Sequence, residues 1–242
     1  MFKSICIWGI IPFAIYFFTK INSQKQQENS APEIKILKPL DQSVFDWNSV
    51  VPYSISVSDP EDGKSEYDEI NNQEVIMEIM FFPDSSALAN YSTNNSKSTR
   101  NLLREMSRHN CLNCHAARNK LIGPSFDLIA QRYVNKEIQV DLLATKLIDG
   151  STGVWGEEKM PPQPDLKLDK AQEMVRWILK FGDMNKFEFY AGTSGAFKTK
   201  PEPDYKGESI YLLTASYTDH GLGNGPNSSK EGIHSIVMLS TK

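Results

Sequence analysis

The stretch "CLNCHAARNKLIGPSF", residues 111–126, decides the interpretation of this chain. Two cysteines are separated by two residues, and His115 follows the second one directly. This spacing is the attachment pattern of c-type haem, in which each thiol bonds one vinyl group and the histidine ligates the iron. The same five residues leave a zinc site and a disulfide-exchange site open as alternatives.

The rest of the chain favours haem over these alternatives. A structural zinc site needs four ligands, which usually come as two pairs, and the sequence contains no second cysteine pair. Of the other histidines only His109 is near, because His220 and His234 lie close to the C-terminus. A thioredoxin-like site needs a βαβ context, whereas the residues around the motif have helical and loop patterns.

Length and charge limit the classes of function. A chain of 242 residues is long enough for one or two domains. Its formal net charge of −4 provides no basic surface for DNA or RNA, so we expect no nucleic-acid partner.

The N-terminus has the layout of an export segment. Lys3 precedes an apolar run over residues 5–18, and a polar stretch follows. Residues 1–23 are therefore predicted to be an export signal, or an N-terminal anchor if they are retained; a buried helix is the alternative. We expect a periplasmic or exported protein, held at the inner membrane in the anchored case. Cleavage would remove Cys6 and leave Cys111 and Cys114 as the cysteines of the mature chain.

Two blocks of predicted strands surround a block of predicted helices. Alternation of apolar and polar residues predicts strands over residues 32–84, within a first β part that spans 32–90, and again over 185–242. The inward positions are Tyr53, Ile55 and Val57, then Val75, Met77, Ile79 and Phe81, and finally Tyr211, Leu213, Ala215 and Tyr217. The predicted fold class is thus a multidomain α and β protein.

The middle block, residues 98–183, has helical spacing. One helix is expected to close at Gly150, and another to end at Gly182. Asp169 and Gln172 are predicted to cap the start of the second of these helices. The polar stretch over residues 90–101 is predicted to be a linker or loop.

Met160 is a candidate ligand because of its local sequence, "EEKMPPQP". The prolines after it stiffen a segment that cannot become helix, which suits a thioether held at an iron. A methionine is often only core filler, and this interpretation fits Met106, Met174 and Met184.

In order along the chain, "CLNCHAARNKLIGPSFDLIAQRY", "LATKLIDGSTGVWGEEKMPPQP" and "AQEMVRWIL" resemble the small bacterial class I cytochromes c. The resemblance covers about 80 residues and implies an all-α domain with one covalently bound haem c. It implies that Cys111 and Cys114 carry the thioethers. It also implies that His115 is the proximal iron ligand and Met160 the distal one.

The same resemblance implies three supporting roles around the haem. Pro124 matches the proline whose carbonyl accepts the N–H of the proximal histidine. Trp155 matches a tryptophan that donates to a haem propionate. Lys146 stands where the family often has an arginine near that propionate, and a lysine supplies the charge without the bidentate fork.

The flanking strands resemble a second family. "VSDPEDG" and "IYLLTASYTDHG" are similar to segments of the immunoglobulin-like sandwich of the polycystic-kidney-disease (PKD) type. The early segment precedes the helical block and the late one follows it, so we expect the cytochrome domain to be inserted in one sandwich. The alternative is a cytochrome flanked by a small β domain and an independent C-terminal hairpin.

Together these features predict an exported mono-haem electron carrier and not an enzyme. The combination of modules resembles segments that accompany sugar dehydrogenases, so the expected redox partner is a sugar or alcohol dehydrogenase or a respiratory protein. Whether the chain is part of a dehydrogenase complex stays open. The alternatives are a sensor or enzyme with a labile methionine ligand, and a glycan- or protein-binding module with an accessory haem.

Overall fold

The computed structural model describes residues 28–91, 93–133, 136–203, 207–223 and 228–241. The predicted export segment, residues 1–23, and Cys6 lie outside the described residues. Within the described ranges, no helix is long and apolar enough to cross a membrane.

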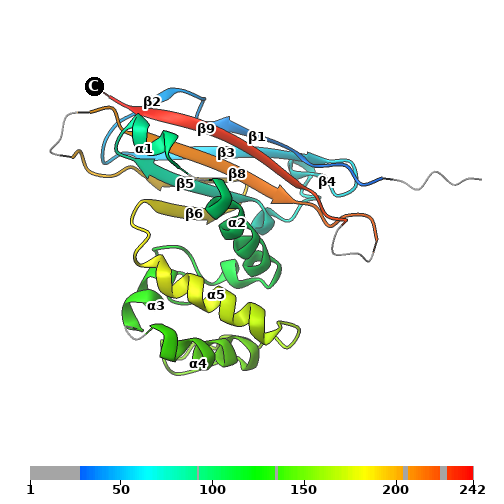
Figure 1. Cartoon of the computed structure of the whole chain (residues 1–242). Coiled ribbons are helices and arrows are strands. Elements are labelled where there is room, and N and C mark those ends of the chain that lie inside the picture. Colours follow the sequence, from blue (N-terminus) through cyan, green and yellow to red (C-terminus); the bar gives the residue numbers. More distant parts are fainter. Residues whose placement is uncertain (1–27, 92, 134–135, 204–206, 224–227, 242) are drawn as a thin grey trace, which may run out of the picture.

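The strands form two sheets that pack face to face (Figure 1). The first sheet contains β1 (Glu33–Lys38), β3 (Val50–Asp59), β4 (Gly63–Lys64) and β7 (Ser194–Lys198). The second sheet has the order β2 (Ser43–Phe45), β9 (Glu231–Ser240), β8 (Ile210–Thr218), β5 (Ile76–Phe82) and β6 (Phe187–Ala191). Among the described strands every pairing is antiparallel except the parallel one between β2 and β9.

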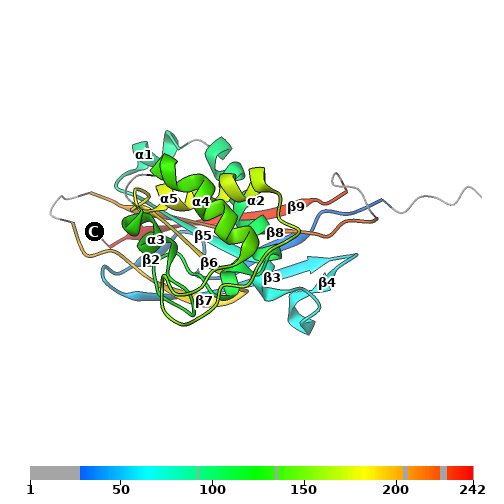
Figure 2. The same ribbon diagram turned by 90° about the horizontal axis from the view of Figure 1, so that it is seen from below.

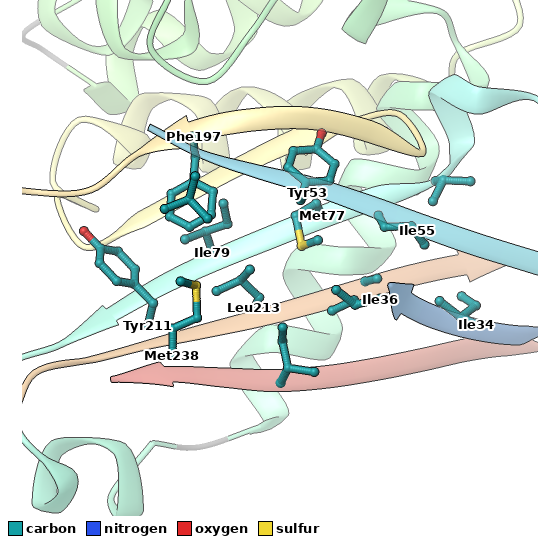
Figure 3. Packing of buried hydrophobic residues seen from close by; sticks show 14 of the residues in the cluster. Ile34, Ile36, Tyr53, Ile55, Met77, Ile79, Phe197, Tyr211, Leu213 and Met238 are labelled. Carbon is teal, nitrogen blue, oxygen red and sulfur yellow. The ribbon is translucent and has the colours of Figure 1, made fainter. Parts of the chain in front are cut away.

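The main apolar core lies between these two sheets (Figure 3). The predicted inward positions of β3, β5 and β8 are all buried in it, which confirms the alternation. Figure 3 shows Tyr53 and Ile55 of β3 directed toward Met77 of β5 and Leu213 of β8. Successive side chains of a strand point to opposite faces of the sheet. In the second sheet, one face packs against the first sheet and the opposite face packs against the helices.

The helices gather on one side of the second sheet (Figures 1 and 2). The α-helices are α1 (Ser85–Ala89), α2 (Thr93–Arg108), α3 (Phe126–Arg132), α4 (Lys136–Asp149) and α5 (Leu168–Phe181). The short 3₁₀ helices are η1 (Ser65–Tyr67), η2 (Asn72–Glu74) and η3 (Cys111–Asn113). As predicted, α4 ends before Gly150 and α5 before Gly182.

The prediction of a linker over residues 90–101 is wrong, because α2 begins at Thr93. Arg100, in the middle of this helix, makes tertiary ion pairs. Arg100 Nε lies 2.9 Å from Glu231 Oε1, and Arg100 Nη1 lies 3.6 Å from Glu78 Oε2. These pairs join the helix to β9 and β5, which local sequence does not reveal.

The predicted capping pair of α5 is also wrong. The N-cap residue is Lys167, and its side chain makes no capping hydrogen bond. Gln172 does not fold back on the helix start, because its Nε2 donates to Asp141 Oδ1 of α4 at 2.7 Å. The helix start is therefore fixed by packing on a neighbouring helix.

Strand β6 connects the sandwich to the helices. Phe187 and Phe189 are 5% and 2% exposed, and their rings lie 6.5 and 6.0 Å from the Trp177 ring of α5. Ile76 of β5 and Leu103 of α2 belong to the same apolar cluster. The outer face of the second sheet is thus part of the core of the helical block.

The buried carboxyl of Glu78 in β5 makes the stability of this layer sensitive to pH. The residue is 6% exposed, and burial raises the pKa of its carboxyl to about 7, although Arg100 opposes the shift. Between roughly pH 4.5 and 7 the folded chain therefore binds more protons than the unfolded chain. Stability should fall as the pH rises through this window, by up to about 3 kcal/mol for this group.

A Glu78→Gln variant should lose this part of the pH dependence. We expect its free energy of unfolding, measured with urea at pH 5 and pH 8, to change less between the two conditions than that of the wild type. Glu137→Gln, at a carboxylate whose side chain is 77% exposed, is the matched control and should follow the wild type. An unchanged pH slope in Glu78→Gln would show that this carboxyl does not titrate in the window.

Candidate functional site

The imidazole of His115 is oriented by one hydrogen bond. Its Nδ1 lies 2.6 Å from the carbonyl oxygen of Pro124. A carbonyl only accepts, so Nδ1 carries the proton and Nε2 is left with its lone pair. Burial lowers the pKa of His115, and the hydrogen bond to Pro124 partly opposes this shift. The ring is therefore neutral at pH 7, which is the form that ligates a metal.

Two further residues confine the same ring. A Cβ atom on Gly123 would lie 2.5 Å from His115 Cε1, so only glycine leaves room for the imidazole here. The Phe126 ring is stacked on the imidazole, with centroids 5.8 Å apart and planes inclined by 17°. The ring is thus held at its edge by Pro124 and along its face by Phe126.

The two cysteines lie on one short helical turn. The backbone N–H groups of Cys114 and His115 both donate to the Cys111 carbonyl, at 3.2 and 3.0 Å. Both cysteines are free thiols. Burial raises the pKa of the Cys111 thiol to about 11, so it stays protonated at neutral pH in the folded chain.

Met160 is fixed by an antiparallel bridge to Ser151. The Met160 N–H donates to Ser151 O at 2.9 Å, and the Ser151 N–H donates to Met160 O at 3.1 Å. Gly150 precedes this bridge with φ of +78°, and a Cβ there would lie 2.7 Å from Met160 O. Glycine is therefore required both by the backbone conformation and by the close approach of the loop.

These segments surround a cavity with two adjoining parts. One part is lined by six predicted site residues, Cys114, His115, Pro124, Lys146, Trp155 and Met160. Cys111 lines the adjoining part, which again includes Cys114, His115 and Met160. The structure therefore brings all seven predicted site residues to one place.

The chemistry of this cavity fits a haem. Its walls are apolar side chains from α3, α4 and α5, namely Ile129, Leu143, Leu147, Val175, Ile178 and Leu179. Such walls suit a flat apolar macrocycle, and Lys146 provides a positive charge for an anionic edge. Two thiols, an imidazole lone pair and a thioether are the donor set that a c-type haem uses.

Several contacts of the site were not predicted from the sequence. Arg132 lies over the Trp155 ring, 4.6 Å from its centroid. His109 Nδ1 lies 3.3 Å from Gln163 Oε1, which connects the segment before the cysteines to the loop after Met160. No local pattern indicates either pair, because each partner lies in a different segment.

Comparison with known proteins gives the family. No family model matches the chain. Cytochrome c-552 of Nitrosomonas europaea is 38% identical over 72 residues, which are 30% of this chain and 70% of that protein. Cytochrome c-551 of Azotobacter vinelandii is 38% identical over 69 residues, which are 28% of this chain and 83% of that protein.

Through this segment the chain belongs to the class I c-type cytochromes. Such cytochromes bind covalently attached haem c and carry electrons, and they are not enzymes. The crystal structure of N. europaea cytochrome c552 is 36% identical to the aligned part of this chain. It covers 31% of this chain and 94% of its own, with a TM-score of 0.30.

The close approach of Gly123 to His115 in this cytochrome segment gives a direct test. Gly123→Ala should push the imidazole away from the Pro124 carbonyl and lower the free energy of unfolding by about 1–3 kcal/mol. Leu121→Ala, at a residue that is 50% exposed, should change it by less than about 0.5 kcal/mol. Chemical denaturation of both variants measures the difference, and equal stability of the two would contradict the steric argument.

Proposed function

We propose that this protein is a single-electron carrier that holds one haem c with His115 and Met160 as its axial ligands. The observation that supports it best is that His115, whose Nδ1 is bound to the Pro124 carbonyl, lines one cavity together with Met160 and both cysteines. Cys111 and Cys114 would provide the two thioether bonds. When bound, the haem would supply the iron that is oxidised and reduced. The residues of the chain would set its orientation, its exposure to water and the charge near it.

The chain's own residues orient, insulate and charge the site. Pro124 fixes the proximal ring and, by accepting the hydrogen bond from Nδ1–H, raises the basicity of Nε2. The apolar walls exclude water, which keeps solvent reorganisation small when the charge of the site changes. Trp155 and Lys146 are proposed to bind the propionates, the first as a hydrogen-bond donor and the second through its charge.

Two axial ligands from the protein favour a carrier over an enzyme, because they leave no open position for a substrate. The donor or acceptor is proposed to be a periplasmic sugar or alcohol dehydrogenase or a respiratory protein. The chain is proposed to act outside the cytoplasm, either free or held at the inner membrane through residues 1–23. Partner and location rest on the resemblance of the combined modules and on the N-terminal sequence.

The sandwich is proposed to be one immunoglobulin-like domain of the PKD type, formed by residues 32–90 and 185–242, with the cytochrome domain, residues 98–183, as an insertion. Pairing of β3 with β7 and of β5 with β6 and β8 supports this, because each pair joins strands from both sides of the helices. The parallel pairing of β2 with β9 supports the same arrangement, because it also joins a strand from before the helices to one from after them. Such a domain would serve as a docking or spacing module.

Covalent haem is the first property to test. We expect the chain, expressed with a periplasmic haem-attachment machinery, to keep its haem on a denaturing gel stained for peroxidase activity. A pyridine haemochrome spectrum should give one haem per chain. The Cys111→Ala/Cys114→Ala variant should lose both signals, and a wild-type protein without covalent haem would refute the proposal.

Met160→Leu tests the distal ligand, since it keeps the apolar volume and removes the sulfur. The midpoint potential should fall, because a thioether ligand raises it, and the sulfur-to-iron charge-transfer band should disappear. Met184→Leu, at a partly buried methionine outside the cavity, should leave both unchanged. Unaltered spectrum and potential in Met160→Leu would exclude Met160 as the ligand.

Carbon monoxide separates the carrier from a sensor or enzyme. The reduced wild-type protein should resist CO, and reduced Met160→Leu should bind it rapidly. Rapid binding by the wild type would favour the alternative with a labile methionine. Glycan affinity that persists in the haem-free Cys111→Ala/Cys114→Ala variant would favour the binding module.

A further inference from the structure

The proximal imidazole has a second support that originates outside the cytochrome segment. The hydrogen bond from Nδ1 to the Pro124 carbonyl fixes one point of the His115 ring, but the ring can still tilt about that point. The stacked ring of Phe126 limits this tilt because the two planes are only 17° from parallel. The orientation of His115 therefore depends on what holds Phe126.

Phe126 is held by a ring from the sandwich. It is 2% exposed, and the Phe189 ring of β6 lies 5.8 Å from it with an interplanar angle of 31°. On its other sides are Trp177 and Phe181 of α5, at 6.1 and 6.4 Å. The latter two belong to the helical block itself, so among the ring pairs of the described residues Phe189 is the sandwich ring that contacts Phe126 directly.

The position of Phe189 is set by the sheet. Its Cα is paired with Glu78 of β5, and β5 is in turn paired along its length with β8. A residue inside a strand moves only if the strand moves, because its backbone is fixed by the ladder on that side. The pairing with β5 thus holds the backbone of Phe189, whose ring packs against Phe126.

Arg118, which follows the cysteine motif in the sequence, links the two segments that carry Phe126 and Phe189. Its Nη2 donates to the carbonyls of Met184 and Phe187, at 2.7 and 3.1 Å. Its Nε lies 3.7 Å from Glu188 Oε1, and its Nη1 lies 3.4 Å from Asp127 Oδ1. One side chain therefore binds the start of β6 and the first turn of α3, where Phe126 lies.

We propose that Phe189 is a positioning residue for the proximal ligand, acting through Phe126, so that the sandwich helps to set the orientation of the His115 ring and with it the redox potential. This inference rests on the proposed ligation of the haem by His115. Phe189 itself lines neither part of the cavity, and it contacts Phe126, which lines the adjoining part.

The test compares two phenylalanines of the same strand in the haem-loaded full chain. Phe187 is 5% exposed and contacts Trp177, Phe181 and Phe189, but its ring makes no contact with Phe126 among the ring pairs of the described residues. Phe189→Ala and Phe187→Ala should thus lower the melting temperature alike. Only Phe189→Ala should shift the hyperfine-shifted haem methyl resonances of the oxidised protein and the midpoint potential.

Phe189→Leu keeps most of the apolar volume but removes the flat ring beside Phe126, so it should shift the resonances and the potential in the same direction by a smaller amount; it serves as the test if Phe189→Ala fails to fold. The inference is overturned if Phe189→Ala and Phe189→Leu leave the resonances and the potential at wild-type values, or if Phe187→Ala shifts them equally. The comparison of these variants is made in a wild-type protein whose haem has an imidazole ligand. A wild type without one refutes the proposed function instead, and this inference falls with it.

Discussion

The packing of the β6 phenylalanines against the aromatic rings of α3 and α5 is the contact on which the rest of this structure depends. Phe187 and Phe189 belong to a strand of the sandwich, yet they are buried in the core of the helical block. Removal of one such buried ring typically costs about 3–5 kcal/mol, which is a large part of the stability of a domain. The proposed haem site lies beside this contact, since the Phe126 ring packs against both His115 and Phe189.

Much of the candidate site could be predicted because its chemistry is encoded in short segments. The cysteine spacing with its following histidine, and the prolines after Met160, are patterns of a few residues each. Cys111, Cys114, His115 and Met160 were selected from these patterns, and the family resemblance added three further residues; all seven line one cavity. The strands that alternate cleanly were predictable for the same reason, because burial of every second residue leaves a period that is visible in the sequence.

What could not be predicted depends on partners far away in the chain. In the middle of α2, Arg100 pairs with Glu231 and Glu78, which belong to two different strands. Strand β7 has only Phe197 buried, so it carries no alternation that would reveal it, and it forms because β3 offers an edge. The contact of Phe126 with Phe189 could not be predicted for the same reason, since the sequence around either residue does not reveal that the two rings meet.

The adjacency of β5 and β6 has a consequence for how the chain matures. These strands are neighbours in one sheet, although roughly 100 residues separate Phe82 from Phe187, so the whole helical block is the loop of a hairpin. Closing a flexible loop of that length costs about 4 kcal/mol, whereas a folded block with adjacent ends has already closed it. Whatever stabilises the block, a bound cofactor included, therefore also stabilises the sheet. A chain whose block stays unfolded has to close this loop when its sheet forms, so its sandwich is less stable and more open to proteases.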